Sequence, residues 1–247
     1  MTKGIDISRW QGANFNIAAA KAAGCKYVIA RIMTGEVTPG KDSQWDNYYK
    51  QAKASGIPIG AYVFGNATTI EAARREATEA LAYLSKTQCE FPIFYDVESK
   101  AMMTLSKRTL TDVIKAFCEA VEAAGYWVGI YSSTDVFNNK MYDTELKRWS
   151  HWVADWRGKK PTLKSGADVQ IWQTGSQKNY QPGIEVDQDI CYVDYFESKI
   201  KARGLNNWPK PTETKPDDTD EELSLALSSI ANAVNTIRKI LERRKKK

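Results

Sequence analysis

The residues best suited to chemistry are two carboxylates, Asp96 and Glu98, separated by Val97 at the end of the apolar run 91–95. Alternate side chains of a β-strand face the same side, so both acids are expected on one side of a strand, about 6–7 Å apart along it. Two neighbouring carboxylates beside apolar residues lower the stability of the fold, so such a pair is expected where a functional site needs it. Cleavage of a glycosidic bond needs such a pair, with one acid to protonate the leaving oxygen and one anionic group to manage the developing positive charge.

Eight short segments have the composition of strands, and helical patterns lie between the early ones. The strands are expected at residues 3–8, 27–32, 58–64, 92–98, 126–132, 151–156, 168–173 and 184–189. The helices are expected at residues 17–23, 42–54, 70–85 and 109–124. Strand–helix–strand spacing favours parallel pairing in a barrel or a doubly wound sheet, and eight strands favour the barrel. The fold class is therefore predicted as α/β, a TIM-like (β/α) barrel whose helix ring is incomplete because the last three connections are short.

Polar and aromatic residues recur where these strands end, which is where such barrels carry their chemistry. They are Asp6, Tyr62, Asp96, Glu98, Tyr131, Asp155, Trp172, Gln173 and Asp187. One acid at a strand end would mean little, but a ring of acids and aromatics from most strands predicts one pocket. A structural role competes with a functional one at Asp155, and the aromatic members could instead be core residues.

Several reaction classes are excluded by composition. The one histidine, His151, cannot build a zinc site that needs two or three, and its place at a strand start does not suit a Cys–His peptidase. The four cysteines are scattered through apolar or helical runs and are expected to be buried free thiols. No metal or cofactor is expected. No apolar run reaches the length of a membrane span. The first residues lack the pattern of a secretory signal, so synthesis in the cytoplasm without a signal peptide is expected.

Taken in order along residues 3–198, these motifs resemble the family 25 glycoside hydrolases, the N-acetylmuramidases (lysozymes) found in bacteriophage endolysins and some microbial autolysins. The segments that carry the resemblance are 4–8 (Gly-Ile-Asp-Ile-Ser), 60–64 (Gly-Ala-Tyr-Val-Phe), 95–98 (Tyr-Asp-Val-Glu), 130–132 (Ile-Tyr-Ser), 171–173 (Ile-Trp-Gln) and 186–187 (Val-Asp). Val63 departs from the pattern, because many members have histidine there; altered positioning rather than lost activity is expected.

The resemblance implies hydrolysis of the β-1,4 bond after N-acetylmuramic acid with retained configuration, and it implies a role for each matching residue. Glu98 would be the general acid/base, with its pKa raised by neighbouring acids. Asp96 would stay ionised and either stabilise the transition state or orient the substrate's N-acetyl group. Asp6 and Asp187 would hold the hydrogen-bond network around this pair. Tyr62, Tyr131, Trp172 and Asp155 are the candidate substrate contacts.

Composition changes near residue 205, which gives a predicted catalytic barrel over 1–205, a proline- and charge-rich linker over 206–219 and a helix over 220–247. In that helix, apolar residues are spaced alternately by four and three, as in a coiled-coil-type heptad repeat. They are Leu223, Leu227, Ile230, Val234, Ile237 and Leu241. Leucine at a and isoleucine at d favour assemblies larger than dimers, so a homo-oligomer (trimer or tetramer) through 223–241 is expected. Docking of this helix on its own barrel remains an alternative.

The positive charge is concentrated in the same region. Residues 201–247 hold 11 Lys and Arg against 7 Asp and Glu and so carry four of the five net positive charges. The basic C-terminus could draw the protein weakly toward anionic wall polymers. No nucleic-acid-reading motif is present, so nucleic acid is not an expected partner.

Three functions fit these observations to different degrees. A peptidoglycan-degrading lysozyme, in the form of a phage endolysin that acts on the bacterial cell wall after release, fits best. A non-catalytic cell-wall glycan-binding barrel is disfavoured because both Asp96 and Glu98 are present. Another retaining glycosidase, such as a chitinase, is disfavoured because no further acids precede Asp96 on its strand.

Overall fold

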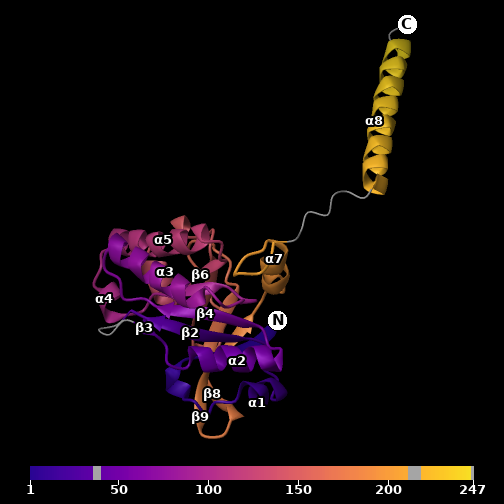
Figure 1. The fold of residues 1–247 in the computed structure, drawn as a ribbon. Coiled ribbons are helices and arrows are strands. Elements are labelled where there is room, and N and C mark those ends of the chain that lie inside the picture. Colours follow the sequence, from indigo (N-terminus) through magenta and orange to yellow (C-terminus); the bar gives the residue numbers. More distant parts are fainter. Residues whose placement is uncertain (36–39, 211–217, 246–247) are drawn as a thin grey trace. The chain divides into compact units, whose positions relative to one another are not determined.

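The computed structural model describes residues 1–35, 40–210 and 218–245 (Figure 1). The chain forms two compact units, Met1–Lys210 and Pro211–Lys247. The first unit holds the sheet and the surrounding helices, and the second contains one long helix.

The first unit is a closed eight-stranded barrel, as predicted. The sheet order is β1-β9-β8-β7-β6-β5-β4-β2-β3, and β1 also pairs with β2, which closes the ring. The two-residue strand β3 adds to the edge of β2 outside that ring. The strands are β1 (Thr2–Ile7), β2 (Val28–Thr34), β3 (Gly40–Lys41), β4 (Ile59–Phe64), β5 (Ile93–Asp96), β6 (Val128–Ser133), β7 (Ser150–Ala154), β8 (Ile171–Gln181) and β9 (Ile184–Cys191).

The last strand runs against the expected direction. β9 is antiparallel to both β8 and β1, whereas the other ring pairings are parallel. Only two residues, Pro182 and Gly183, separate β8 from β9, and a connection that short can join only antiparallel strands. Asp187 therefore reaches the barrel mouth from the beginning of its strand, not from its C-terminal end, and it pairs with Asp6.

Helices cover the first half of the ring and largely disappear from the second, which confirms the predicted incomplete ring (Figure 1). Side-chain caps on Asn16, Thr69 and Ser106 start three of the long predicted helices. The 155–170 connection contains no helix. The helices of the first unit are α1 (Ile17–Ala22), α2 (Trp45–Ser55), α3 (Ile70–Leu84), α4 (Lys100–Met103), α5 (Lys107–Ala123), α6 (Thr134–Asn139) and α7 (Phe196–Ala202), with short 3₁₀ turns η1 (Arg9–Gln11) and η2 (Asp143–Glu145).

Strand alternation sorts the buried apolar residues into two clusters. One lies between the strands and the helices and includes Val28, Val153 and Trp172. The other fills the barrel and includes Phe94 and Trp152, whose rings lie 5.2 Å apart. The inner cluster forms an aromatic floor beneath the polar mouth. All four cysteines are buried and free, as predicted.

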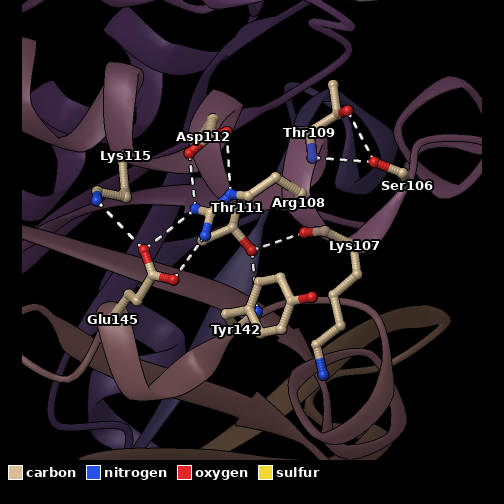
Figure 2. A network of polar contacts seen from close by, with 9 residues as sticks. All are labelled: Ser106, Lys107, Arg108, Thr109, Thr111, Asp112, Lys115, Tyr142 and Glu145. Atoms are coloured by element: carbon tan, nitrogen blue, oxygen red, sulfur yellow. Dashed lines mark hydrogen bonds and ion pairs between the residues drawn. The ribbon is translucent and has the colours of Figure 1, made fainter.

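The connection between β6 and β7 is held by a polar network on α5 (Figure 2). Arg108 donates to both carboxylate oxygens of Glu145, at 2.6 and 3.1 Å, and to both of Asp112, at 2.6 and 3.0 Å. Tyr142 donates its backbone N–H to Thr111 Oγ1 at 2.9 Å. The connection, which contains α6 and η2, is thus fixed by side-chain contacts to a long helix.

The predicted boundary after residue 205 falls too early. Asn206 is fully buried and donates to the carbonyls of Cys89 and Phe91. Asn207 and Trp208 also donate to carbonyls of the barrel unit. Residues 206–208 therefore belong to the barrel, which ends at Lys210. The linker prediction over 211–217 lies outside the described residues.

The second unit contains α8 (Asp218–Lys245), a helix of 28 residues. The sequence predicted a helix over 220–247. Five of the predicted heptad residues are 50–60% exposed: Leu223, Leu227, Ile230, Val234 and Ile237. The side chains of the sixth, Leu241, and of the basic residues 243–247 lie outside the described residues. Among the described residues, no helix has the length and apolar character needed to cross a membrane.

Candidate active site

A cavity of about 230 Å³ opens where the parallel strands end. It brings together six of the eight predicted site residues, which come from β1, β4, β6 and β9 and from the end of β5 and the residues just after it. They are Asp6, Tyr62, Asp96, Glu98, Tyr131 and Asp187. The remaining lining residues are Ile7, Ser8, Trp10, Gln11, Arg31, Phe64, Trp152 and Gln173. The predicted pocket therefore exists, and acidic residues dominate its wall.

Asp96 and Glu98 do not share a strand as expected, because β5 ends at Asp96. The extended path continues for one residue: Val97 donates its N–H to Tyr131 O at 2.9 Å. Ser99 then caps α4 and turns the chain away. Both carboxylates still line the cavity, with Asp96 buried and Glu98 exposed at its rim.

Gln173 is the hub of the hydrogen bonds in the cavity. Its Nε2 donates to Asp6 Oδ2 at 2.9 Å, and its Oε1 accepts from Tyr131 Oη at 2.9 Å and from Trp156 Nε1 at 3.2 Å. Gln173 was placed in the predicted ring of strand-end residues but was given no catalytic or binding role, although alternation from the inward Ile171 points it into the barrel. It fixes Asp6 and Tyr131 relative to each other.

Trp172 was predicted to contact substrate, and the structure places it elsewhere. It points out of the barrel into the apolar cluster under the helices, and its Nε1 donates to Asp155 O at 2.7 Å. It is absent from the cavity wall. Two exposed tryptophans lie in this region instead: Trp10 (75% exposed) lines this cavity, and Trp156 (59% exposed) lines an adjoining one. Exposed large aromatic rings next to a cavity are the signal that sequence reasoning did not use.

A further buried acid, Asp189, was also missed. It follows Asp187 by two residues, so both face the barrel interior. Asp189 is fully buried, and its Oδ1 accepts from Trp152 Nε1 at 2.7 Å. Trp152 forms part of the cavity wall, so Asp189 supports that wall from below.

The carboxyl groups of the mouth all hold protons more strongly than usual. Burial, followed by the charge of Asp187, raises the pKa of Glu98. Burial, followed by Asp187, also raises the pKa of Asp6 well above its usual value. For Asp187, burial and then Glu185 raise the pKa to about 6. The prediction of a raised pKa at Glu98 is confirmed in direction; although its side chain is exposed at the rim, loss of water around the carboxyl group in the cavity contributes more than the neighbouring acids.

The expectation that Asp96 stays ionised is not supported. Burial raises the pKa of Asp96 well above its usual value, Glu98 and Asp6 raise it further, and only Arg31 opposes them. Its Oδ1 is buried without a hydrogen-bond partner. The free site therefore favours a protonated Asp96, which a hydrogen-bond donor from a ligand would shift toward the ionised form.

Arg31 is the one basic residue in the described cavity wall. Its Nε donates to the buried Asp42 at 2.7 Å, while its Nη2 is buried without a partner. Arg31 Nη2 and Asp96 Oδ1 are thus a donor and an acceptor left open in the same cavity, as expected of groups that bind a polar ligand.

A second cavity of about 410 Å³ adjoins the first and shares Glu98, Tyr131 and Gln173 with it. Asp155 lines this second cavity and not the first. It accepts from Arg157 Nε at 2.8 Å and from Thr134 Oγ1 at 2.9 Å, and the Arg157 contact lowers its pKa to about 2. Asp155 is therefore an ionised, paired carboxylate, separate from the acid cluster.

His151 takes no part in the mouth. It is buried, with Nε2 2.7 Å from Asp143 Oδ1 and Nδ1 2.9 Å from Trp149 O. No group of three or more His, Cys, Asp or Glu in the described part of the chain has an arrangement that could hold a metal ion. The chemistry available at the mouth is that of four carboxyl groups with raised pKa values in the first cavity, one of which, Glu98, also faces the second cavity; this defines a glycosidase-type site.

Comparisons with known proteins agree with this class. The sequence model of glycosyl hydrolases family 25 matches residues 5–184, and the chain belongs to this family. Among solved structures, the CTP1L endolysin is 25% identical, with a TM-score of 0.70 over 82% of this chain and 70% of that one. A lysozyme from Streptomyces coelicolor (22% identity, TM-score 0.66, 84% and 98% covered) and a muramidase from Acremonium alcalophilum (21%, 0.66, 84% and 99%) share the fold. A search of curated proteins gives no match.

Proposed function

We propose that this protein is an N-acetylmuramidase (lysozyme) that hydrolyses the β-1,4 bond between N-acetylmuramic acid and N-acetylglucosamine in peptidoglycan, with retention. One observation carries the proposal: Glu98, with a raised pKa, stands on the wall shared by the acidic cavity and its open neighbour. A sugar on each side of that wall would place the bond between them beside a protonated carboxyl group. Family membership and the lysozyme and muramidase neighbours support the substrate class.

The first cavity suits the sugar that develops positive charge. Four acids line it against one base, and an acid that gives up its proton when the sugar binds, as Asp96 does on accepting a hydrogen bond, favours an oxocarbenium-like transition state over the neutral substrate. Glu98 donates its proton to the leaving oxygen and later takes one from the attacking water. Asp96 Oδ1, which lacks a partner in the free site, accepts a hydrogen bond from the N-acetyl N–H and so orients that group as the internal nucleophile.

The supporting residues keep this geometry fixed. Gln173 links Asp6 to Tyr131, and Asp187 lies opposite Asp6 on the neighbouring strand. Tyr62 and Tyr131 line the cavity above the buried Trp152 and present ring faces or edges to the sugar. Asp155 contacts the sugar on the far side of Glu98, in the second cavity.

Fragment analysis of digested walls tests the reaction. Purified peptidoglycan is digested, and the new reducing ends are identified by mass spectrometry after borohydride reduction. Muramic acid at the new ends supports the proposal. Glucosamine ends would instead identify a glucosaminidase-type or chitinase-like reaction, and the absence of any release would point to a glycan-binding barrel.

The likeness to an endolysin supports a role in lysis of a bacterial host after phage replication. In that role the protein is made in the host cytoplasm and reaches the wall upon release. Expression in bacterial cells tests this role: lysis should follow membrane permeabilisation, and the Glu98→Gln variant should not lyse under the same treatment.

We further propose that α8 assembles the chain into a trimer or tetramer. Its heptad residues repeat along one stripe, and the five that the structure describes are at least half exposed, so identical helices would bury them against one another. Sedimentation of the full chain should give a mass of three or four copies, and I230K/I237K should reduce it to one. The matched variant S228K/N235K, on a neighbouring stripe, should keep the assembly. A monomeric wild type would instead favour docking of α8 on its own barrel.

The basic C-terminal residues are proposed to add weak attraction to anionic wall polymers. Binding of the inactive Glu98→Gln chain to walls should then weaken as salt increases. It should weaken less for a variant with residues 243–247 changed to glutamine. Equal salt dependence of the two chains would contradict this contribution.

A further inference from the structure

A third cavity, of about 430 Å³, continues the groove beyond the second one. The two share Thr134, Asp135, Asp155 and Arg157 in their walls. The third cavity also includes Lys159 and Lys160. The groove therefore runs from the acidic cavity, past Glu98, to a region that we call the basic lobe and define by Arg157, Lys159 and Lys160.

The balance between acidic and basic side chains in the wall of the groove reverses along this path. The first cavity has four acids and one base in its wall, whereas the third has three bases and two acids. One of those two acids, Asp155, is already paired with Arg157 through contacts of 2.5 and 2.8 Å. Lys159 and Lys160 are thus opposed only by Asp135. Lys160 Nζ lies 3.8 Å from the centroid of the Tyr192 ring, which is not part of this wall and does not neutralise the ammonium charge.

The order of the sugars decides what reaches the basic lobe. If the ring that is cleaved occupies the acidic cavity, the leaving sugar occupies the second cavity and the next sugar lies at the third. In peptidoglycan the two sugars alternate, so when muramic acid is cleaved, the sugar after the leaving one is again muramic acid. That sugar carries a short peptide with free carboxylates.

We propose that the basic lobe binds the carboxylates of the peptide on the muramic acid beyond the leaving sugar, so that the enzyme prefers glycan that carries its peptides. This inference rests on the proposed muramidase function. Phosphate groups of wall polymers would satisfy the same lysines, but the stem peptide is favoured because the lobe is continuous with the groove that holds the scissile bond.

The test compares K159Q/K160Q with wild type on two substrates: walls with their stem peptides, and the same walls after an amidase has removed them. On peptide-bearing glycan the variant should raise KM about fivefold with little change in kcat, as two exposed ion pairs predict. On peptide-free glycan the two enzymes should be equal. The control K3Q/K26Q removes two exposed lysines beside the N-terminal ends of β1 and β2, away from the cavities, and should match wild type on both substrates.

Binding in the Glu98→Gln background separates the two proposals. A tetrasaccharide with peptides should bind more tightly than one without, and K159Q/K160Q should abolish that difference even if the reaction proves to differ from the one proposed. Equal losses on both substrates, or no loss on either, would overturn the inference. So would a loss that vanishes when only phosphate-containing polymers are extracted from the walls, because the lobe would then bind those polymers.

Discussion

Two clusters of charged residues in this barrel are built in opposite ways. In the network of Figure 2, Asp112 and Glu145 face Arg108 and Lys115, and hydrogen bonds from Arg108 lower the pKa of Glu145. At the mouth, four acids share one base, and burial raises the pKa of each acid. The first arrangement ties the β6–β7 connection to a helix. The second keeps protons on carboxyl groups, which opposes folding at neutral pH but supplies a proton donor.

The comparison predicts that amide substitutions have opposite effects in the two clusters. Glu98→Gln should lower turnover about 10³-fold, because the proton donor is lost, and should leave the melting temperature unchanged or higher, because like-charge repulsion is removed. The matched change Glu145→Gln should keep turnover and lower the melting temperature. Release of reducing ends and thermal unfolding measure both effects. Retained lysis by Glu98→Gln would falsify its role as the acid.

The one base of the mouth should matter most for stability. Arg31→Met leaves the buried Asp42 without its charged partner and should lower the free energy of unfolding by about 3–5 kcal/mol. It also removes the charge that opposes proton binding at Asp96, so turnover should fall as well. Urea unfolding at neutral pH gives the free energy. A loss below about 1 kcal/mol would mean that this pair behaves like an exposed ion pair.

The pH dependence of stability should reveal the mouth acids directly. Asp187 has a pKa of about 6 in the folded protein against a usual value of 3.8, so between these values the folded state holds a proton that the unfolded chain has released. The bound proton stabilises the folded state fully below the unfolded pKa of 3.8, and this stabilisation is lost as pH rises through about 6. The melting temperature should therefore fall from mildly acidic to neutral pH, and Asp187→Asn should flatten that slope. An unchanged slope would contradict the assignment.

Turnover should also depend on pH, through the raised pKa of Glu98. Glu98 must hold a proton to act as the acid, and its pKa is raised, so turnover should persist to higher pH than an ordinary glutamate would allow and then fall. Glu145 shifts the other way, with a pKa below its usual value, and its contribution is lost as pH falls.

Much of the barrel follows from local patterns. Strand alternation and helix caps are written in short stretches of sequence, so the eight strands and the four long helices could be predicted. The direction of β9 could not, because the polar residues 174–181 look like a loop and become strand only by pairing with β9. The prediction that Trp172 contacts substrate was wrong because it relied on the large aromatic ring and not on strand alternation. Alternation points Gln173 into the barrel and Trp172 out of it.

The protonation of the site was beyond sequence reasoning for a different reason. The acids could be gathered by the rule that barrel chemistry lies at strand ends. Their pKa values depend on how deeply each carboxyl is buried and on which charges surround it. Asp96 shows this: its ionisation was expected from its role, and its burial below the rim argues for the protonated form in the free site. Asp189 stayed hidden because its neighbours alone gave no motif.

The smallest expected effect on stability and turnover is in the network around Arg108. Arg108→Ala removes four hydrogen bonds, but the residue is exposed and exposed ion pairs contribute little. The melting temperature should fall by less than half of the fall for Arg31→Met, with turnover unchanged. Arg108→Lys, which keeps the charge but not the planar fork, should recover only part of the loss. If Arg108→Ala lowered turnover as Arg31→Met does, the two clusters would be coupled through the β6–β7 connection, and the separation between a stabilising and a catalytic set of charges would not hold.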